Sequence, residues 1–180
     1  MAVTLNETPS GNRLHIGIFG KTNSGKSSFF NTFSGQKVSI VADVAGTTTD
    51  PVYKPMEIYP LGPCILIDTA GFDDEGELGA LRIEKTSLAA QKTELAIILF
   101  CEDEMVQELK WYNYFKKRQT PVIPVLGKAD LYTQEQKEYL IQMIQKNTGE
   151  TVCPVSSETG EGIRKLKEPV SYTHLTLPTT

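Results

Sequence analysis

The sequence predicts a three-layer α/β sandwich around a mostly parallel six-stranded sheet with one antiparallel edge strand. The first observation is that short apolar segments alternate with longer helix-like segments, as in folds built from βαβ units. The second is that residues 64–67 are all apolar, which is typical of a strand covered on both faces. The third is the turn at residues 60–63, which joins two strand-like segments so closely that they are expected to form an antiparallel hairpin.

The local pattern justifies each element in turn. The helix expected over residues 134–147 has the clearest boundaries, because Thr133 and Gln136 form a capping pair and Gly149 follows its end. Its apolar positions recur at helical spacing, so they are assigned to the core. Strand-like segments lie at residues 14–19, 37–42, 52–59, 63–68, 95–101, 121–126 and 151–155, and further helices are expected at residues 27–33, 78–91, 104–118 and from about 162 onward.

Composition limits the classes of function. The chain has 180 residues, of which 39% are apolar and 22% charged, as expected for one ordinary domain. Its net charge of −4 does not favour nucleic-acid binding, so no nucleic-acid partner is expected. No apolar run is long enough to cross a membrane and no signal pattern begins the chain, which favours a cytoplasmic location without membrane contact. Cys64, Cys101 and Cys153 are expected to be buried free thiols.

The residues GKTNSGKS at positions 20–27 fit the pattern G-x-x-x-x-G-K-[S/T] between an expected strand and an expected helix. Glycines allow successive N–H groups to face a phosphate, and the helix that follows adds the positive end of its dipole. Lys26 can reach the β- and γ-phosphate oxygens, and Ser27 offers a hydroxyl to Mg²⁺. The pattern predicts a nucleoside triphosphate site with contacts from Gly20, Asn23, Ser24, Gly25, Lys26, Ser27 and Ser28.

Two further motifs follow in chain order. In the letters DTAG, Asp68 ends an expected strand and can hold Mg²⁺ through water, while the N–H of Gly71 can approach the γ-phosphate. In the letters GTTTD, the hydroxyl of Thr48 is expected to complete the Mg²⁺ shell while the γ-phosphate is present, and Thr47 is expected to contact the nucleotide. Each motif is weak alone, and their order supports one phosphate and Mg²⁺ site.

The choice of base is expected to depend on Asp130. Its carboxylate can accept from both the ring N–H and the exocyclic amine of guanine, and adenine offers no such pair of donors. Lys128 would lay its aliphatic stem along the base, and the segment with Ser156 and Ser157 would donate to the guanine carbonyl. If Asp130 only capped the next helix, an ATP-dependent enzyme would remain an alternative. The motifs together favour GTP.

The order of these motifs resembles the Ras-like P-loop GTPases of the translation-factor class over residues 13–167. More narrowly, the chain resembles the HydF family, the GTPases of [FeFe]-hydrogenase maturation. That closer similarity is carried by RLHIGIFGK at 13–21, AGTTTDPVYK at 45–54 and DTAGFDDEG at 68–76. The tRNA-modification GTPase MnmE is a related family that shares the glycine loop, the G-T-T and the D-T-A-G.

The resemblance implies hydrolysis of GTP to GDP and phosphate with Mg²⁺, as a conformational switch in hydrogenase H-cluster maturation. It implies that Asn23 resembles the asparagine of potassium-activated GTPases, which holds K⁺ against the phosphates. Lys26, Asn23, Thr48 and Gly71 are then the catalytic candidates. Phe72 stands where Ras-type enzymes place a water-orienting glutamine, so slow intrinsic hydrolysis is expected. The family also implies hydrogenase maturation partners and homodimerisation.

The expected organisation is a flexible segment at 1–12, a GTP-binding domain at 13–168 and a tail at 169–180 that resembles non-native sequence. The dimerisation domain and the iron–sulfur cluster domain of the HydF family have no counterpart, so no cluster is expected in this fragment. Gly127 stands where the base motif usually has asparagine or threonine, which predicts weaker guanine affinity. The alternatives are a tRNA-modification GTPase and a nucleotide-binding scaffold with negligible turnover.

Overall fold

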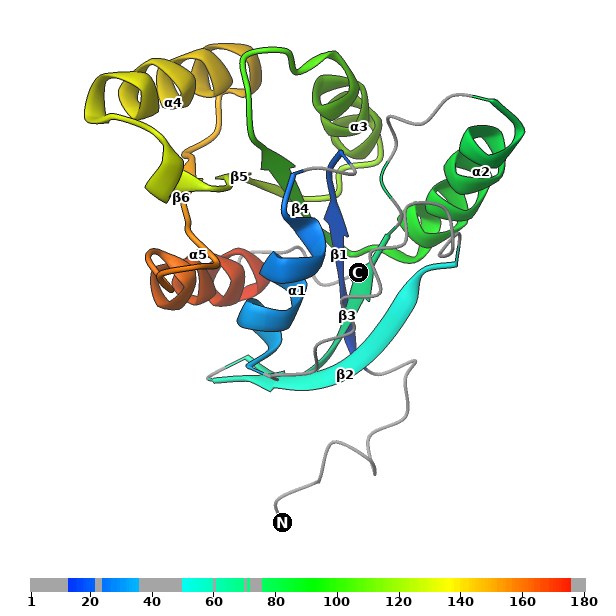
Figure 1. Cartoon of the computed structure of the whole chain (residues 1–180). Coiled ribbons are helices and arrows are strands. Elements are labelled where there is room, and N and C mark those ends of the chain that lie inside the picture. Colours follow the sequence, from blue (N-terminus) through cyan, green and yellow to red (C-terminus); the bar gives the residue numbers. More distant parts are fainter. Residues whose placement is uncertain are drawn as a thin grey trace.

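A computed structural model describes residues 13–21, 24–35, 50–59, 61–69, 71 and 76–175, without the side chains of 76–83 and 171–175. Helices and strands alternate along the described chain (Figure 1). The elements are β1 Leu14–Phe19, α1 Lys26–Ser34, β2 Val52–Ile58, β3 Gly62–Asp68, α2 Gly76–Lys92, β4 Leu95–Phe100, α3 Val106–Lys117, β5 Val122–Leu126, a 3-10 turn Ala129–Leu131, α4 Gln134–Thr148, β6 Cys153–Pro154 and α5 Ile163–Leu175.

The six strands form one sheet in the order β2-β3-β1-β4-β5-β6. β1 pairs in parallel with β3 and β4, and β5 pairs in parallel with β4 and β6. β2 runs antiparallel to β3, with Val52 opposite Asp68 and Ile58 opposite Gly62. The expected fold class is therefore confirmed, including the antiparallel edge strand. β2 and β3 are antiparallel because the turn between them is too short for a parallel crossover connection.

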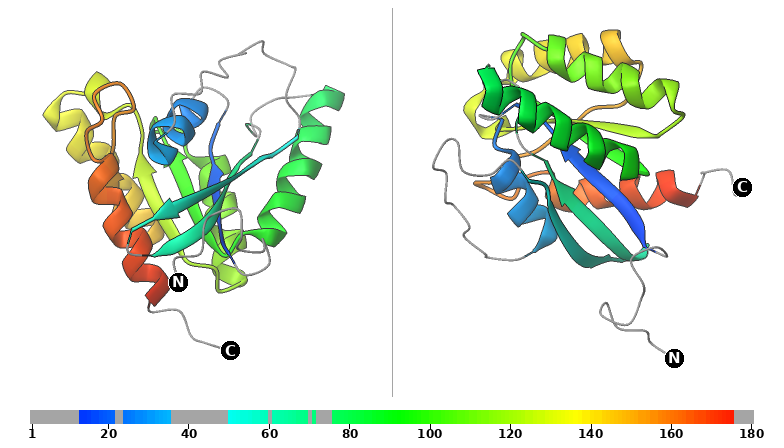
Figure 2. Two further views of the ribbon diagram at one scale, coloured as in Figure 1. Left: turned by 90° about the horizontal axis from the view of Figure 1, so that it is seen from below. Right: turned by 90° about the vertical axis from the view of Figure 1, so that its right-hand side faces the viewer.

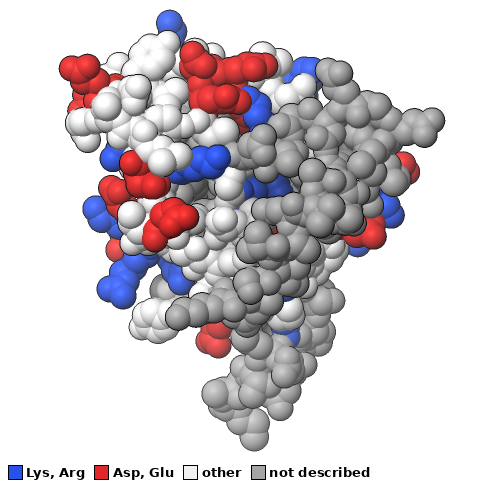
Figure 3. All heavy atoms as spheres, in the orientation of Figure 1, with Lys and Arg blue, Asp and Glu red and all other residues white. Residues whose placement is uncertain are grey.

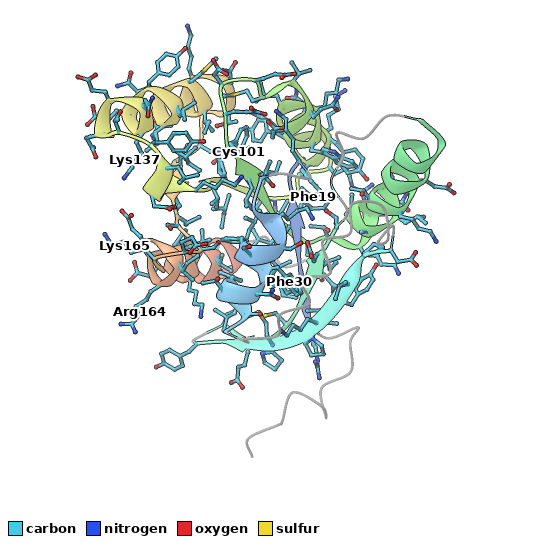
Figure 4. The ribbon with its side chains drawn as sticks, in the orientation of Figure 1. Phe19, Phe30, Cys101, Lys137, Arg164 and Lys165 are labelled. Atoms are coloured by element: carbon cyan, nitrogen blue, oxygen red, sulfur yellow. The ribbon has the colours of Figure 1, made fainter. Side chains whose placement is uncertain are left out.

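Helices cover both faces of the sheet. α1 and α5 pack on one face, and α2, α3 and α4 pack on the other (Figures 1 and 2). Successive strand side chains point to opposite faces, so Ile97 of β4 contributes to the core under α1 and α5 while Ile98 contributes to the core under α3 and α4. Phe30 and Phe19 mark these two cores in Figure 4.

Most expected elements agree with the structure within a few residues. α4 has the expected capping box, in which Gln136 N donates to Thr133 Oγ1 at 3.2 Å and Thr133 N donates to Gln136 Oε1 at 2.9 Å. The expected segment 1–12 and the expected strand at 37–42 lie outside the described residues. α5 continues to Leu175, so the first seven residues of the expected non-native tail are helical, and Val170 is fully buried in the core.

The described surface mixes acidic and basic side chains. Both kinds are interspersed over the described part of the face in Figure 3. On α5, Arg164 and Lys165 point away from the sheet (Figure 4). Among the described helices, none combines the length and the apolar character that a membrane span requires.

Candidate functional site

The expected site residues follow parallel strands at one edge of the sheet. β1, β3, β5 and β6 all run in the same direction, so the loops that follow them lie at the same edge. In open α/β sheets this is the edge at which ligands bind. The structure therefore brings the described part of the phosphate loop (20, 21 and 24–27), Asp68 and the base loop at 127–130 to one side of the molecule.

The described part of the phosphate loop forms a tight turn before α1. Ser24 donates from its backbone N (3.1 Å) and from its hydroxyl (2.7 Å) to the same carbonyl oxygen, that of Lys21. Gly25 has φ 81°, which a residue with a Cβ rarely adopts, and it stands directly before α1. The first helical N–H groups have no side-chain cap, so they remain at the positive end of the helix dipole, as an anion site requires.

Lys26 joins the phosphate loop to the end of β3. Its side chain is buried, and Nζ lies 3.0 Å from Asp68 Oδ1 and also donates to the carbonyl of Thr69. The hydroxyl of Thr69 donates to the carbonyl of Ile18 at 2.7 Å, which ties β3 to β1 below the site. The expected phosphate lysine and the expected Mg²⁺ carboxylate are therefore in direct contact, although they are 42 residues apart.

The base loop presents Asp130 at the surface, where its side chain has one hydrogen-bond partner among the described residues. Ser156 Oγ donates to Asp130 Oδ1 at 2.7 Å, which orients the carboxylate. The backbone N–H of Ser156 donates to the carbonyl of Glu161 at 2.9 Å, so its hydroxyl is the group that reaches the base loop. Ser157 follows and is partly exposed. Ala129 N donates to the carbonyl of Val155 at 2.9 Å and fixes the two loops side by side.

The base loop also contacts the phosphate loop. A Cβ at Gly127 would lie 3.2 Å from the carbonyl oxygen of Ser24, so the absence of a side chain lets the two backbones approach closely. A Cβ at Gly25 would lie 3.5 Å from Cε of Lys128, which places the aliphatic stem of this lysine over the phosphate loop. The two loops are therefore joined by backbone and methylene contacts. Base motifs of this class usually have an asparagine or threonine side chain at the position of Gly127.

Several expected site residues are placed and others fall outside the description. Gly20, Ser24 and Gly71 are buried, whereas Ser27 and Ser28 are exposed at the start of α1. Asn23, Thr47 and Thr48 lie outside the described residues, so the expected K⁺ contact and the threonine contacts remain predictions.

A buried acid beside the phosphate loop was missed by the sequence reasoning. Glu108 lies among the buried side chains of α3, and Lys21 Nζ lies 3.7 Å from its Oε2. The sequence did contain a sign of this burial. Glu108 occupies a position of the apolar helical stripe that is otherwise formed by Met105, Tyr112 and Phe115. A carboxylate at a core position of an amphipathic helix indicates a buried partner.

The donor set fits a hard cation bound together with phosphate. Mg²⁺ in nucleotide sites is held by one or two protein oxygens and by phosphate oxygens. Asp68 supplies a carboxylate at the end of β3, and Ser27 supplies a hydroxyl next to Lys26, which contacts that carboxylate. Within the described residues there is no cluster of three or more His, Cys, Asp or Glu side chains that could hold a metal without phosphate.

Comparison with known proteins gives a consistent picture. The family model described as 50S ribosome-binding GTPase matches residues 15–128. Among curated proteins, GTPase Der of Wolinella succinogenes is 34% identical over 175 residues, covering 92% of this chain and 36% of Der. The tRNA modification GTPase MnmE of Endomicrobium trichonymphae is 32% identical over 176 residues, covering 92% of this chain and 37% of MnmE.

Solved structures agree with these relatives. Era of Aquifex aeolicus bound to GDP and AlF4⁻ superposes with a TM-score of 0.73 at 27% identity, covering 92% of this chain and 57% of Era. A structure of Era in complex with MgGDPNP and part of 16S ribosomal RNA gives a TM-score of 0.74 at 27% identity, with the same coverage. The chain spans little more than a third of the length of these two curated relatives, Der and MnmE.

Proposed function

We propose that this chain, which belongs to the 50S ribosome-binding GTPase family, is a potassium-stimulated GTPase that acts as a switch in [FeFe]-hydrogenase maturation. Binding and hydrolysis of GTP are the activities that its relatives share by name. The observation that carries the GTPase part of the proposal is the contact between Lys26 and Asp68 at the edge where the phosphate loop and the base loop meet. This contact places the ammonium group of Lys26, which can bind phosphate, next to the carboxylate of Asp68, which can hold Mg²⁺.

The described residues have distinct roles in binding. The N–H groups at the start of α1 and the ammonium of Lys26 would stabilise the β- and γ-phosphates. Ser27 and Asp68 would hold Mg²⁺, which neutralises charge on the phosphates when bound. Asp130, oriented by Ser156, would accept two hydrogen bonds from guanine. The buried Gly71 would bring a backbone N–H to the γ-phosphate without steric obstruction.

Potassium stimulation is proposed for Asn23. Phosphoryl transfer requires positive charge near the oxygen that bridges the β- and γ-phosphates, and a monovalent cation supplies it where other systems use an arginine. The support is the asparagine within GKTNSGKS. Thr48 is proposed to complete the Mg²⁺ shell and Thr47 to contact the nucleotide. With phenylalanine at position 72, turnover without a further activator is expected to be slow.

The role in hydrogenase maturation is supported by the HydF-like residues TDPVYK at 49–54 and FDDEG at 72–76. Hydrogenase maturation partners, a homodimer and a cytoplasmic location belong to the same proposal. A role in tRNA modification is the second candidate, because a tRNA modification GTPase matches 92% of the chain. Deleting the gene that encodes this domain separates the two. Loss of hydrogenase activity with normal tRNA modification supports the first role, and the reverse result supports the second.

The biochemical test measures GTP hydrolysis with Mg²⁺ in KCl and in NaCl at equal ionic strength, with ATP as competitor. Faster turnover in KCl that excess ATP does not inhibit is the expected result. Lys26→Met should abolish GTP binding, and Asp130→Ala should remove the preference for guanine. Glu135→Ala is the matched control for Asp130→Ala, because it removes a surface acid from the next helix. GTP binding with no turnover in either salt would instead indicate a nucleotide-dependent scaffold.

A further inference from the structure

A cluster of charged side chains lies beside the phosphate loop, outside the nucleotide contacts described above. Lys21, the second residue of the loop, donates from Nζ to Glu102 Oε1 at 2.8 Å and to the backbone carbonyl of Glu104 at 2.6 Å. Glu108 Oε2 lies 3.7 Å from the same nitrogen. The connection from β4 to α3 and the first turn of α3 therefore hold one lysine of the phosphate loop through three groups.

Glu108 differs from the other acid in this cluster because it is buried. Its side chain is 1% exposed, against 52% for Glu102. Neither carboxylate oxygen of Glu108 has a hydrogen-bond partner in the described part of the chain. A buried carboxylate without hydrogen bonds costs free energy, whereas an apolar side chain at this core position would not. The acid is therefore unfavourable for packing, and among the described residues Lys21 is the positive charge that offsets the burial of its carboxylate.

The charge of Glu108 depends on its surroundings. Burial raises its pKa to about 7, and the positive charge of Lys21 opposes part of this rise. Burial alone would lower the pKa of Lys21, but the hydrogen bond with Glu102 and the charges of Glu108 and Glu102 raise it, so the lysine stays charged. Among described residues, Lys21, Glu102 and Cys101 are the titratable groups that interact with Glu108.

The backbone of Lys21 connects this cluster to the phosphate site. Its carbonyl oxygen accepts both hydrogen bonds from Ser24, which close the turn before Gly25 and Lys26. A shift of Lys21 would move this acceptor and open the turn. The N–H groups that bind phosphate must be held in a fixed concave arrangement, and small displacements of binding groups reduce affinity.

We propose that Glu108 is a positioning residue that fixes the phosphate loop through Lys21 and so sets the affinity for guanine nucleotide. This role goes beyond the proposed switch function and depends only on nucleotide binding. When Glu108 is charged, Lys21 is held from the buried side as well as from the surface. When it is neutral, the partners that Lys21 keeps among the described residues are the half-exposed Glu102 and the Glu104 carbonyl, and an ion pair with a half-exposed acid holds a side chain weakly.

The test compares the Kd for GDP of wild type and Glu108→Gln between pH 6 and pH 8.5. Glutamine keeps the shape and removes the charge. The phosphate of GDP itself titrates in this range and changes both Kd values equally. The ratio of the two Kd values is therefore used at each pH, because the titration of the nucleotide cancels in it. The ratio should be near one at pH 6 and rise to about fivefold at pH 8.5. A ratio that is constant over this range would overturn the proposal.

A double-mutant cycle separates positioning from general damage. Lys21→Met should weaken GDP binding, and adding Glu108→Gln to it should have no further effect if the two residues act as a unit. Additive effects of the two substitutions would contradict the proposal. Glu138→Gln, an exposed acid on α4, is the control and should give a ratio of one at every pH. Thermal melting at each pH confirms that every variant is folded.

Discussion

A single hydroxyl determines how the base loop presents its carboxylate. Asp130 is exposed, and within the described part of the chain its side chain has one hydrogen bond, from Ser156. The Ser156 hydroxyl also accepts from the backbone N of Thr159 at 3.1 Å, so its position is fixed from two sides. Ser156 itself is fully buried, so the hydroxyl that joins these two exposed residues is held within the protein. The serine therefore supports the site without needing to touch the nucleotide.

Ser156→Ala is expected to weaken GTP binding by about tenfold, because Asp130 loses the donor that orients it and the backbone N–H of Thr159 loses its acceptor. The preference for GTP over ATP should fall as well. Competition binding with both nucleotides measures this. Ser34→Ala, which removes a hydroxyl at the end of α1, is the control and should leave both affinities unchanged. Unchanged nucleotide preference in Ser156→Ala would show that Asp130 is oriented by other groups.

The raised pKa of Glu108 leads us to expect an unusual dependence of stability on pH. Its pKa is about 7 in the folded protein against 4.5 for the ordinary side chain, so folding favours the protonated acid. Its contribution to stability is complete below pH 4.5 and is lost as the pH rises through 7. Glu108→Gln should therefore gain on the order of 2–3 kcal/mol relative to wild type between pH 5 and pH 8. Urea unfolding at both pH values measures it, and an equal difference at the two values would contradict it.

The junction between β6 and α5 is a tightly packed connection. Gly160 and Gly162 both have positive φ, 78° and 77°, just before α5 begins at Ile163. They differ in their surroundings. A Cβ at Gly162 would collide with the carbonyl of Pro154 in β6, whereas a Cβ at Gly160 would meet nothing within 4 Å. The start of the helix is therefore held directly against the last strand of the sheet.

Alanine at these two positions separates backbone strain from steric collision. Gly160→Ala is expected to cost about 1 kcal/mol, because alanine disfavours a left-handed conformation. Gly162→Ala carries the same strain and adds a collision with backbone, so it should cost at least about 2 kcal/mol more. Chemical denaturation of both variants gives the difference. Equal losses of stability would show that α5 shifts away from β6 without cost.

The molecule as a whole depends on α5 to close one face of the sheet. α1 and α5 share one core with β1, β3, β4 and β5, and Ile163, Leu166 and Val170 are the buried positions of α5 in that core. Their spacing of three and four residues is that of one helical face. The residues after Glu168 are therefore part of this packed layer as far as Val170, whatever the origin of that sequence.

Val170→Ala tests this contribution. Val170 is fully buried, so removing two methyl groups should leave a cavity and cost about 2 kcal/mol. Glu168→Ala, exposed on the same helix, should be nearly neutral. The melting temperatures of the two variants measure the contrast. Similar melting temperatures for Val170→Ala and wild type would mean that the end of α5 does not support the core in solution.

The predictability of the site differs from residue to residue. Gly20–Ser27, Asp68 and Asp130 could be found because backbone phosphate binding and guanine recognition need these residue types in a fixed order along the chain. The contacts of Lys21 with Glu102 and Glu108 could not, since the partners are 81 and 87 residues away and no local pattern pairs them. The same holds for Ser156, whose expected role was that of a backbone donor and whose hydroxyl holds Asp130.

The sequence alone determined the alternation of strands and helices, the hairpin and the capped helix α4, because turn chemistry, capping and apolar periodicity act over a few neighbouring residues. It also determined the class of ligand, since a phosphate loop is encoded in eight consecutive residues. Only the tertiary structure decided which polar side chains meet: Lys26 with Asp68, Lys21 with Glu108, and Ser156 with Asp130. These pairs depend on the order of strands in the sheet, which places distant segments at one edge and gives the buried carboxylate of Glu108 a partner that no local pattern identifies.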